Sequence, residues 1–475
     1  MKPLKDCFPA VAFGTSGVRA RVVDLTPQAV AAYATAFARH VRGLLGDKAP
    51  RSVVVGIDLR PSSPAIAAVV CHALHEAGFG VEFAGALPTP ALALRCVTAG
   101  LAGVMVTGSH IPFDRNGIKF YLPSGEILKA DEEAISGTLI EPNALKVPDS
   151  PPLPLESAVA REAYAHRYRE CFGATALKGL RVGLYEHSAV GRDLTGAILE
   201  ALGAAVIRLG RSDAFVPVDT EAVGEADLAQ ARGWCAVHRL DALVSTDGDG
   251  DRPVVFDERG EFVRGDLLGL LCAEALGIEA IAVPVSCNTA LEASGAFARV
   301  VRTRIGSPYV IAGMHALAAE GYTRVAGFEA NGGFLLGSAL PGLAALPTRD
   351  ALLPMIAVLA KAVQSGRPVS ALLAALPASF THSDRIQGIP SAASFALLAR
   401  LSDDAPARDR FYACAVSRFD TTDGLRATLE NGEIVHLRPS GNAPELRCYA
   451  EAGSPQRAAQ LVESYLERAK AAIPA

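Results

Sequence analysis

The sequence predicts an α/β fold of three homologous α/β domains, followed by a smaller C-terminal α+β domain. The chain has 475 residues, whereas a single hydrophobic core stops growing at roughly 250–300 residues. An alternating pattern of strands and helices occurs three times, and each time its last strand leads into a polar, glycine-rich loop. After residue 377 a hairpin pattern replaces it. We therefore expect several packed cores rather than one.

The first repeat begins with a helix at 26–44. Thr26 can cap this helix and Pro27 fits its first turn. Apolar residues recur at helical spacing from Val30 onward. The elements expected after it are strands at 53–57, 81–84 and 102–106, a helix at 64–76 and a second short helix before the last strand.

The same pattern returns in the second and third repeats. Because equivalent strands run in the same direction, the loops that follow them should lie at the carboxyl edges of their sheets, where open α/β sheets bind ligands. The expected elements are strands at 181–185, 205–209, 242–245, 280–285, 300–303 and 323–326, and helices at 193–202, 290–297 and 310–320.

A proline-rich stretch at 147–155 indicates a linker between the first two domains. The C-terminal domain is predicted from strands at 424–429 and 433–437, which flank an Asn-Gly turn that favours a tight hairpin. A strand at 446–450 and an amphipathic helix at 455–472 complete it. We place the four domains at 1–148, 156–258, 259–374 and 378–475.

Composition and charge exclude several classes of partner. The net charge of −5 gives no reason to expect nucleic acid or an anionic membrane as a partner. No segment approaches the roughly 18 uninterrupted apolar residues of a membrane span, and the first residues lack the apolar stretch of a signal peptide. The 9 cysteines are scattered and form no C-x-x-C pair, as in the reduced thiols of a cytoplasmic protein.

The loop at 107–112 reads TGSHIP. Ser109 follows a strand end and a glycine, so its hydroxyl should be reachable. Ile111 stands where the nucleophile elbow of an α/β hydrolase requires glycine, which excludes that class. Lys119 follows in the next segment, and a serine near a cation suits phosphoryl chemistry. Taken alone, this loop is also compatible with a serine that only stabilises a turn.

The loop at 247–252 reads DGDGDR and is more specific. Asp247, Asp249 and Asp251 alternate with glycines between two apolar strands. Hard carboxylates on a tight turn suit Mg²⁺ or another cation that prefers oxygen ligands. Three like charges packed together are costly unless a cation offsets them. This loop therefore predicts a metal site.

The segment at 438–447 reads RPSGNAPELR. It offers two guanidinium groups, a hydroxyl, an amide side chain and a backbone made flexible by glycine. Such groups can cradle a phosphate, because arginine donates forked hydrogen bonds to its oxygens. Taken alone, the segment is equally compatible with an ordinary basic loop.

The order of these motifs resembles that of the α-D-phosphohexomutase superfamily. The sequence FGTSGVR at 13–19 resembles the opening motif of that family, and VGIDLRPSS at 55–63 and PTP at 88–90 are similar to further markers of its first domain. The serine loop, the aspartate loop, a sugar loop reading GFEANGG at 327–333 and the phosphate loop then follow in order, one per domain. The resemblance spans essentially the whole chain and implies a heart-shaped enzyme whose four domains surround a central cleft.

The resemblance also implies a role for each site residue. Ser109 would carry a phosphoryl group and would hold one Mg²⁺ per chain together with Asp247, Asp249 and Asp251. The catalytic candidates beside the serine, for proton transfer and charge stabilisation, are Arg19, His110 and Lys119. The implied substrate contacts are Arg252, Glu329, Asn331, Arg438, Ser440, Gly441, Asn442 and Arg447.

The implied reaction interconverts hexose 6-phosphate and hexose 1-phosphate through a phosphoserine and a hexose 1,6-bisphosphate, which would also act as activator. The partners would be small hexose phosphates, and the chain would be a monomer or a homodimer. The sequences EANGG and GNAPELR look most like the bacterial phosphomannomutase branch, which makes mannose phosphate the expected substrate. Gly333 and Glu445 depart from the family, which commonly has histidine and lysine there. The alternatives are a phosphoglucomutase or dual-specificity enzyme, a phosphoglucosamine mutase, or a sugar-phosphate-binding protein without turnover.

Overall fold

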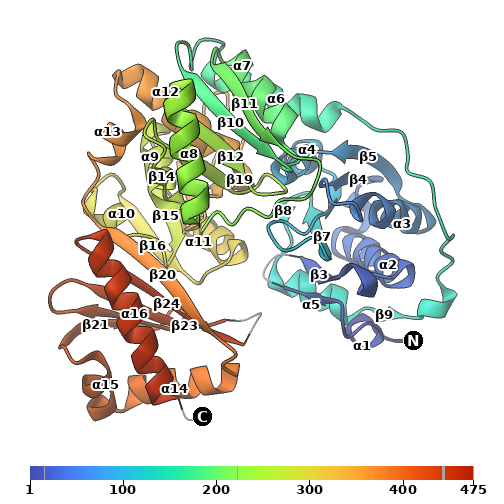
Figure 1. Cartoon of the computed structure of the whole chain (residues 1–475). Coiled ribbons are helices and arrows are strands. Elements are labelled where there is room, and N and C mark those ends of the chain that lie inside the picture. Colours follow the sequence, from blue (N-terminus) through green and yellow to red (C-terminus); the bar gives the residue numbers. More distant parts are fainter. Residues whose placement is uncertain (15–16, 222, 441–443, 474–475) are drawn as a thin grey trace.

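The computed structural model describes residues 1–14, 17–221, 223–440 and 444–473. In these residues the strands form four large sheets and one two-stranded sheet. Each large sheet is the centre of one domain, and we number the domains 1 to 4 in chain order. Figure 1 shows them following one another along an arc, from domain 1 in blue to domain 4 in orange and red.

The first three domains share one sheet topology. Their strand orders are β5-β4-β6-β7, β11-β10-β12-β13 and β16-β15-β17-β18. In each domain the first three strands of the order are parallel, and the fourth is antiparallel to its neighbour. The prediction of three homologous α/β domains is therefore confirmed.

The predicted cap of the first long helix of domain 1, α2, is confirmed. The Oγ1 atom of Thr26 accepts a hydrogen bond from the amide of Ala29 at 3.3 Å. Phe37 of this helix stacks on Phe120 of the sheet, with ring centroids 4.7 Å apart. The elements are β1 (Lys2–Pro3), α1 (Leu4–Cys7), β2 (Ala12–Phe13), β3 (Val18–Arg21), α2 (Pro27–Leu45), β4 (Ser52–Ile57), α3 (Ser63–Glu76), β5 (Gly80–Ala86), α4 (Thr89–Ala99), β6 (Ala102–Val106), β7 (Arg115–Leu122), β8 (Gly125–Glu126), α5 (Lys129–Gly137) and β9 (Leu139–Ile140).

Domains 2 and 3 follow the predicted order of elements, with one helix shorter than expected. The predicted helix at 290–297 ends at Ala293, because Gly295 adopts a left-handed conformation with φ of 64°. The elements are α6 (Val159–Phe172), β10 (Arg181–His187), α7 (Arg192–Ala201), β11 (Ala205–Arg211), α8 (Glu225–His238), β12 (Ala242–Thr246), β13 (Pro253–Phe256), β14 (Phe262–Val263), α9 (Gly265–Ala275), β15 (Ala280–Pro284), α10 (Ala290–Ala293), β16 (Arg299–Thr303), α11 (Ser307–Ala319), β17 (Val325–Phe328), β18 (Phe334–Leu336), β19 (Leu346–Asp350), α12 (Leu352–Ser365) and α13 (Val369–Leu373).

Domain 4 is built on an antiparallel sheet of order β20-β24-β23-β22-β21. The predicted hairpin is the pair β22 and β23, and Gly432 in its turn has a φ of 85°. The predicted C-terminal helix packs across this sheet (Figure 1). The elements are β20 (Phe380–Gln387), α14 (Ser391–Asp403), α15 (Ala405–Tyr412), β21 (Val416–Asp420), β22 (Leu425–Leu429), β23 (Ile434–Pro439), β24 (Glu445–Ala452) and α16 (Pro455–Ala472).

Polar contacts join the domains and so position their loops. The hydroxyl of Ser307 in domain 3 donates to Glu126 of domain 1 at 2.8 Å. Domain 4 contacts domain 3 at Asp423, whose Oδ2 atom accepts a hydrogen bond from the amide of Ile305 at 3.0 Å.

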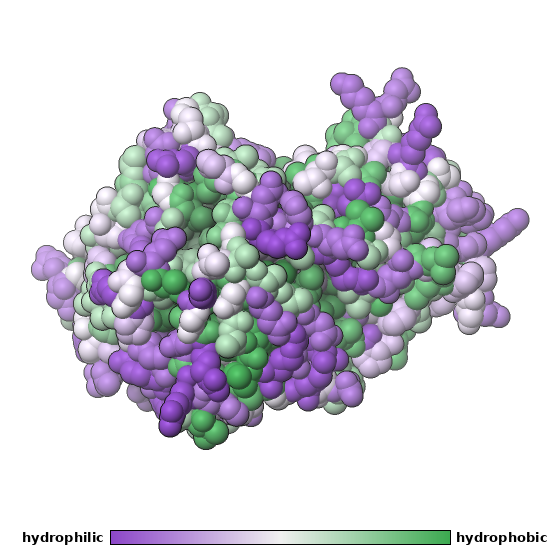
Figure 2. Space-filling view, turned by 90° about the horizontal axis from the view of Figure 1, so that it is seen from above, coloured by the Kyte–Doolittle hydropathy of each residue, from purple (hydrophilic) through white to green (hydrophobic). Residues whose placement is uncertain are grey.

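On the surface seen from above, hydrophilic residues are intermixed with small groups of hydrophobic residues (Figure 2). Among the described helices, none has both the length and the apolar character that a membrane crossing requires.

Candidate active site

The serine loop follows β6, as predicted, and holds Ser109 in an unusual conformation. Ser109 is buried and has a φ of 53°, a left-handed value that few residues other than glycine adopt outside constrained sites. Its Oγ atom donates to Oδ2 of Asp247 at 2.7 Å. Its amide donates to the hydroxyl of Thr107 at 2.8 Å. The hydroxyl is therefore aimed from domain 1 at the aspartate loop of domain 2.

Asp58 and Arg60 hold the serine loop in this shape. Asp58 accepts hydrogen bonds from Oγ1 of Thr107 at 2.7 Å and from the amide of Gly108 at 3.2 Å. The buried guanidinium of Arg60 donates to the carbonyl oxygen of Ser109 at 2.8 Å. A Cβ atom at Gly108 would lie 2.4 Å from Cζ of Arg60, so glycine is required there. Both residues belong to the VGIDLRPSS motif, but the sequence alone did not assign them this task.

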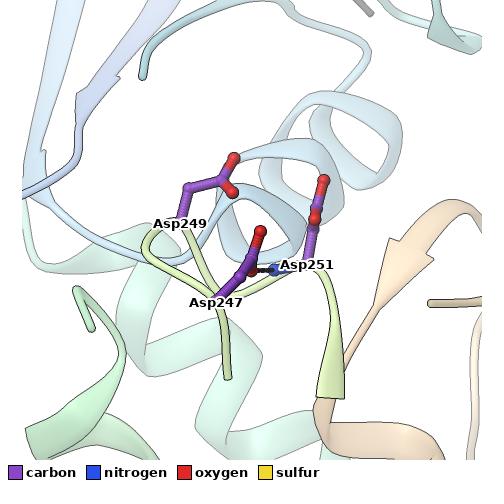
Figure 3. Close-up of side chains that lie close together, drawn as sticks. All are labelled: Asp247, Asp249 and Asp251. Atoms are coloured by element: carbon purple, nitrogen blue, oxygen red, sulfur yellow. Dashed lines mark hydrogen bonds between the residues drawn. The ribbon is translucent and has the colours of Figure 1, made fainter. Parts of the chain in front are cut away.

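The three aspartates of the metal loop converge, as Figure 3 shows. All three are buried, and one carboxylate oxygen of each lies within 4.8 Å of the others. The Oδ1 atom of Asp247 accepts hydrogen bonds from the amides of Asp251 and Arg252, each at 3.2 Å. The backbone of the loop thus fixes the first carboxylate, while the other two project beside it.

The donor set of this cluster fits a cation. Oδ2 of Asp249 accepts hydrogen bonds from Thr89 at 2.7 Å and Lys119 at 2.6 Å, and Oδ2 of Asp251 accepts from Lys119 at 2.9 Å. The Oδ1 atoms of Asp249 and Asp251 are buried and have no hydrogen-bond partner among the described residues. Burial and the two neighbouring carboxylates raise the pKa of Asp247 well above its ordinary value. Oxygen ligands left unpaired in this way suit a hard divalent cation.

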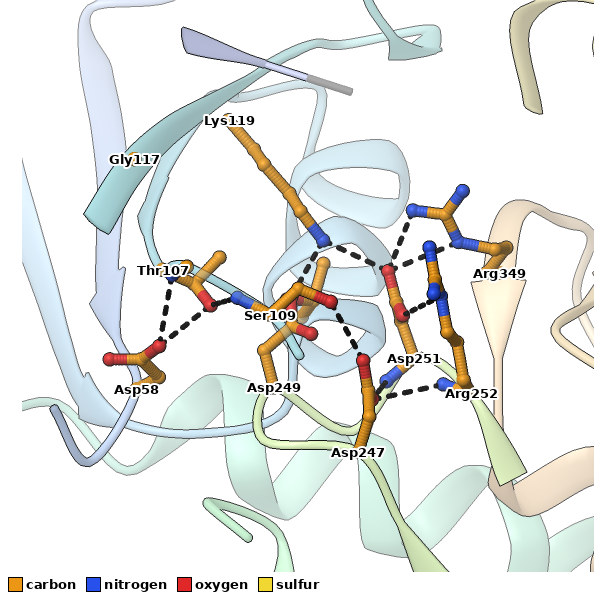
Figure 4. A network of polar contacts seen from close by, with 12 residues as sticks. Asp58, Thr107, Ser109, Gly117, Lys119, Asp247, Asp249, Asp251, Arg252 and Arg349 are labelled. Carbon is orange, nitrogen blue, oxygen red and sulfur yellow. Dashed lines mark hydrogen bonds and ion pairs between the residues drawn. The ribbon is translucent and has the colours of Figure 1, made fainter. Parts of the chain in front are cut away.

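Cationic side chains surround the serine and the aspartates (Figure 4). Burial alone would lower the pKa of Lys119, but the carboxylates of Asp249 and Asp251 raise it above its ordinary value. Nη1 of Arg19 donates to the carbonyl oxygen of Gly108 at 2.7 Å, and burial lowers the pKa of Arg19 to about 10. The structure therefore brings both predicted cations to the serine.

His110 and Arg252 form a second pair beside the serine. Nδ1 of His110 lies 3.5 Å from Oγ of Ser109 and accepts a hydrogen bond from Nη1 of Arg252 at 3.1 Å. Burial, together with the charges of Arg252 and Arg19, lowers the pKa of His110 to about 2. The imidazole is therefore neutral and acts as a hydrogen-bond acceptor in this arrangement.

The sugar loop lies directly beside the metal loop. Glu329 and Asn331 follow β17 and are both buried. Nη1 of Arg349 donates to Oε2 of Glu329 at 2.9 Å, and the same guanidinium contacts Asp251. The side chain of Asn331 accepts a hydrogen bond from the amide of Gly333 at 3.0 Å. Glu329 is thus linked to the metal loop of domain 2 through Arg349, and Asn331 contacts domain 2 through Glu221 at 3.4 Å.

The phosphate-loop residues find their partners mainly within domain 4. Nε of Arg438 donates to Oδ2 of Asp423 at 2.8 Å, and Nη2 of Arg447 lies 3.4 Å from Oε2 of Glu445. The amide of Ser440 donates to the carbonyl oxygen of Glu445 at 2.8 Å. The two other predicted phosphate contacts, Gly441 and Asn442, lie outside the described residues.

Sequence reasoning missed several residues that build the site. Thr89 lies in the PTP motif and Asp58 and Arg60 in the VGIDLRPSS motif, so a signal for them was present. Arg349 lies in no motif that was recognised. Its partners are 20 and 98 residues away along the chain. The sheet of domain 3 brings it to Glu329, and the packing of domain 3 against domain 2 brings it to Asp251.

Comparisons with known proteins agree with this architecture. Four family models, described as phosphoglucomutase/phosphomannomutase alpha/beta/alpha domains I, II and III and C-terminal domain, match residues 10–144, 162–260, 264–380 and 392–468. A phosphomannomutase of Salmonella muenchen is 46% identical over 97% of this chain and 96% of its own length. One from Sinorhizobium fredii is also 46% identical, over 95% of this chain and 97% of its own.

The fold has a counterpart among solved structures as well. The structure of a phosphoglucomutase/phosphomannomutase family protein from Burkholderia thailandensis superposes with a TM-score of 0.78, at 21% identity and with 97% of each chain covered. At that identity the similarity concerns the fold alone, whereas the family models and the two relatives concern the sequence. On this evidence the chain belongs to the phosphoglucomutase/phosphomannomutase family.

Proposed function

We propose that this protein is a phosphomannomutase, which interconverts mannose 6-phosphate and mannose 1-phosphate. The observation that carries the proposal is the buried hydroxyl of Ser109, which donates to Asp247 in a cluster where two carboxylate oxygens have no hydrogen bond among the described residues. The choice of mannose is supported by the 46% identity to two phosphomannomutases over nearly the whole chain.

In the proposed reaction Ser109 carries a phosphoryl group in the active enzyme. The bond from Oγ to phosphorus breaks while a bond forms from phosphorus to the free hydroxyl of the hexose phosphate. That hydroxyl loses its proton and Oγ of Ser109 gains one, so that a free serine and the bisphosphate result. The resulting hexose 1,6-bisphosphate turns over and returns its other phosphoryl group to Ser109. Lys119 and Arg19 are the groups for charge stabilisation and proton transfer, and His110 accepts a hydrogen bond beside the serine.

A phosphoserine carries about −1.5 to −2 charges at neutral pH and would stand beside three aspartates. Asp247, Asp249, Asp251 and the phosphoserine would hold one Mg²⁺, which would offset the negative charge that develops during transfer. Arg252 contributes a further positive charge, since its Nε atom lies 3.8 Å from Asp251.

The remaining predicted residues are assigned to the substrate. Glu329 and Asn331 would bind hydroxyls of the sugar, which is supported by their position beside the metal loop. The proposed contacts of the phosphate group that does not react are Arg438, Ser440, Gly441, Asn442 and Arg447. Because this loop must accept the intermediate in both orientations, we expect domain 4 to move during turnover.

The proposal includes further points. Hexose 1,6-bisphosphate acts as activator, because it can restore the phosphoserine. The chain works as a monomer or a homodimer in the cytoplasm, a location supported by the free thiols of its cysteines. The proposed domain limits are 1–148, 156–258, 259–374 and 378–475.

The first prediction tests the phosphoserine. Ser109→Ala should remove nearly all mutase activity in a coupled assay and leave thermal unfolding unchanged, because the residue lies on a loop outside the sheet. Intact-protein mass spectrometry should find a phosphorylated fraction in the wild type and none in the variant. Turnover at the wild-type rate in Ser109→Ala would contradict the mechanism.

The second prediction tests the metal. Excess chelator should abolish activity, and Mg²⁺ should restore it. Calcium should bind but support turnover poorly, because it tolerates looser geometry than an in-line transfer needs. Asp249→Ala should be inactive at any Mg²⁺ concentration. Full activity in excess chelator would exclude the metal role while leaving the phosphoserine prediction intact.

A further inference from the structure

We propose that Arg349 is a positioning residue that joins the sugar loop to the metal loop and orients Asp251 toward the cation. This inference rests on the proposed function, because it assigns Arg349 a task in the same site. No motif in the sequence pointed to this residue.

The contacts of Arg349 are specific and buried. Its Nε and Nη2 atoms donate to Oδ2 of Asp251 at 3.1 and 2.8 Å, and its Nη1 atom donates to Oε2 of Glu329 at 2.9 Å. The side chains of Arg349, Asp251 and Glu329 are 3%, 2% and 7% exposed. One guanidinium therefore ties a residue of domain 2 to a residue of domain 3 with little screening by solvent.

These contacts determine which oxygen of Asp251 remains for a cation. Arg349 and Lys119 both donate to Oδ2 of Asp251, so that oxygen is occupied from two sides. Oδ1 of Asp251 is buried and has no hydrogen-bond partner among the described residues, although Nε of Arg252 lies 3.8 Å from it. Partners behind a metal ligand set its orientation and affinity in this way, and their loss typically costs 10- to 100-fold in metal affinity or activity.

Gly333 explains why the sequence can place an arginine here. A Cβ atom at position 333 would lie 2.7, 2.8 and 2.9 Å from Cδ, Cγ and Cβ of Arg349. The stem of Arg349 therefore fills the space that any side chain at 333 would take. Position 333 is where the resembling family commonly has histidine. In this chain position 333 has no side chain, and the side chain of Arg349 from the neighbouring strand β19 occupies that space.

The arrangement also pairs buried carboxylates of the site with cations. Lys119 contacts Asp249 and Asp251, and Arg349 contacts Asp251 and Glu329. Removing Arg349 leaves the buried carboxylate of Glu329 without this cation. Because a buried unpaired charge is strongly unfavourable, both loops should shift. The metal and the sugar should then be affected together.

The test measures Mg²⁺ binding to the protein by calorimetry, without substrate, and kcat and KM for mannose 6-phosphate separately. Arg349→Gln should weaken Mg²⁺ binding at least tenfold and lower kcat. Arg349→Lys keeps the charge but cannot reach both carboxylates. Compared with Arg349→Gln, it should therefore recover part of the Mg²⁺ affinity, while KM for mannose 6-phosphate stays altered. Arg302→Gln is the matched control, because Arg302 also pairs with a carboxylate, that of Glu292, and donates to the carbonyl of Cys287, outside the four loops.

A second set of variants uses the close contact with Gly333. Gly333→Ala should mimic the loss of Arg349, since the new methyl group displaces the stem of that side chain. In the double variant with Arg349→Gly the three atoms of Arg349 that the methyl group would meet are all absent, so Gly333→Ala should then add little further loss of Mg²⁺ affinity. Independent, additive losses of Mg²⁺ affinity would overturn the assignment. This set also keeps the proposal testable if Arg349→Gln does not fold.

Mg²⁺ affinity and kcat at wild-type values in a folded Arg349→Gln variant would also overturn the proposal. That result differs from failure of the proposed function, in which the wild-type protein itself would turn over no mannose phosphate. The Mg²⁺ measurements still decide the role of Arg349 in that case, because they require no turnover.

Discussion

Glu329 pairs with one charged group of the site and has a second, proposed task. Its Oε2 atom accepts the hydrogen bond from Arg349, and its proposed task is to bind hydroxyls of the sugar. Mannose and glucose differ only in the configuration at C2, and a site rejects an analogue strongly only when a buried polar group is left unpaired. No residue of the site has been assigned to the hydroxyl at C2. Glucose phosphate should therefore also be turned over to some degree.

The third prediction tests the role of Glu329. Glu329→Gln should lower kcat/KM for mannose phosphate and for glucose phosphate together, by about tenfold or more, because both sugars lose the same charged contact. Glucosamine phosphate, which adds a positive charge, should be the poorest substrate of the three in the wild type unless it pairs with Glu329. The measurement is a panel of the three sugar phosphates. Loss of one sugar alone would show that another residue reads C2.

Among the elements, the segment between β11 and α8 contacts the metal loop, the sugar loop and the Arg60 side chain that holds the serine loop. The guanidinium of Arg60, which holds the serine loop, lies 4.1 Å from the ring centroid of Phe215 in this segment. A Cβ atom at Gly248 of the metal loop would lie 3.3 Å from the same ring. Further along, Glu221 accepts a hydrogen bond from Asn331 of the sugar loop at 3.4 Å. This segment therefore supports the site from the domain 2 side.

The fourth prediction concerns Phe215. Phe215→Ala removes a cation–π contact worth about 1 kcal/mol, and with it one of the supports of the Arg60 guanidinium that fixes Ser109. We expect a fall in kcat of about fivefold with little change in unfolding temperature. Phe395→Ala is the control, because that ring lies exposed in domain 4. An unchanged kcat in Phe215→Ala would show that Arg60 holds the serine loop without the ring.

At the scale of the whole molecule, a buried carboxylate joins domain 2 to domain 3. The hydroxyls of Tyr164 and Tyr168 in α6 both donate to Asp350 at the end of β19, the former at 2.6 Å. Burial, and next the charge of Asp350, raise the pKa of both tyrosines well above its ordinary value, so both remain protonated donors. Asp350 directly follows Arg349, so this contact also fixes the strand that carries Arg349.

The fifth prediction tests this contact. Asp350→Ala leaves two buried hydroxyls without a partner, each costing about 1–3 kcal/mol. The free energy of unfolding in urea should fall by roughly 2–5 kcal/mol, well beyond the effect of Tyr164→Phe, which removes one donor and leaves no group unpaired. A loss in Asp350→Ala no larger than in Tyr164→Phe would mean that water replaces the carboxylate.

The sequence by itself determined the features that depend on residues close together in the chain. The cap of α2 at Thr26, the β22–β23 hairpin and the convergence of Asp247, Asp249 and Asp251 all follow from local spacing and backbone preference. The three repeats could be predicted for the same reason: the residues that specify each strand, helix and glycine-rich loop are close together in the chain. The assigned roles of the site residues and the domain limits stay predictions.

How the serine, metal and sugar loops contact one another became visible in the folded chain alone. Asp58 reaches the amide of Gly108 across 50 residues, and Arg349 reaches Asp251 across 98. Nothing in the local sequence of Arg349 distinguishes it from an arginine at the surface, because Glu329 approaches it only in the folded sheet of domain 3 and Asp251 only when domain 3 packs against domain 2. Sequence patterns predict which face of a helix or strand is buried. They do not predict which charged side chains of different domains pair, because that depends on how the folded domains pack against one another.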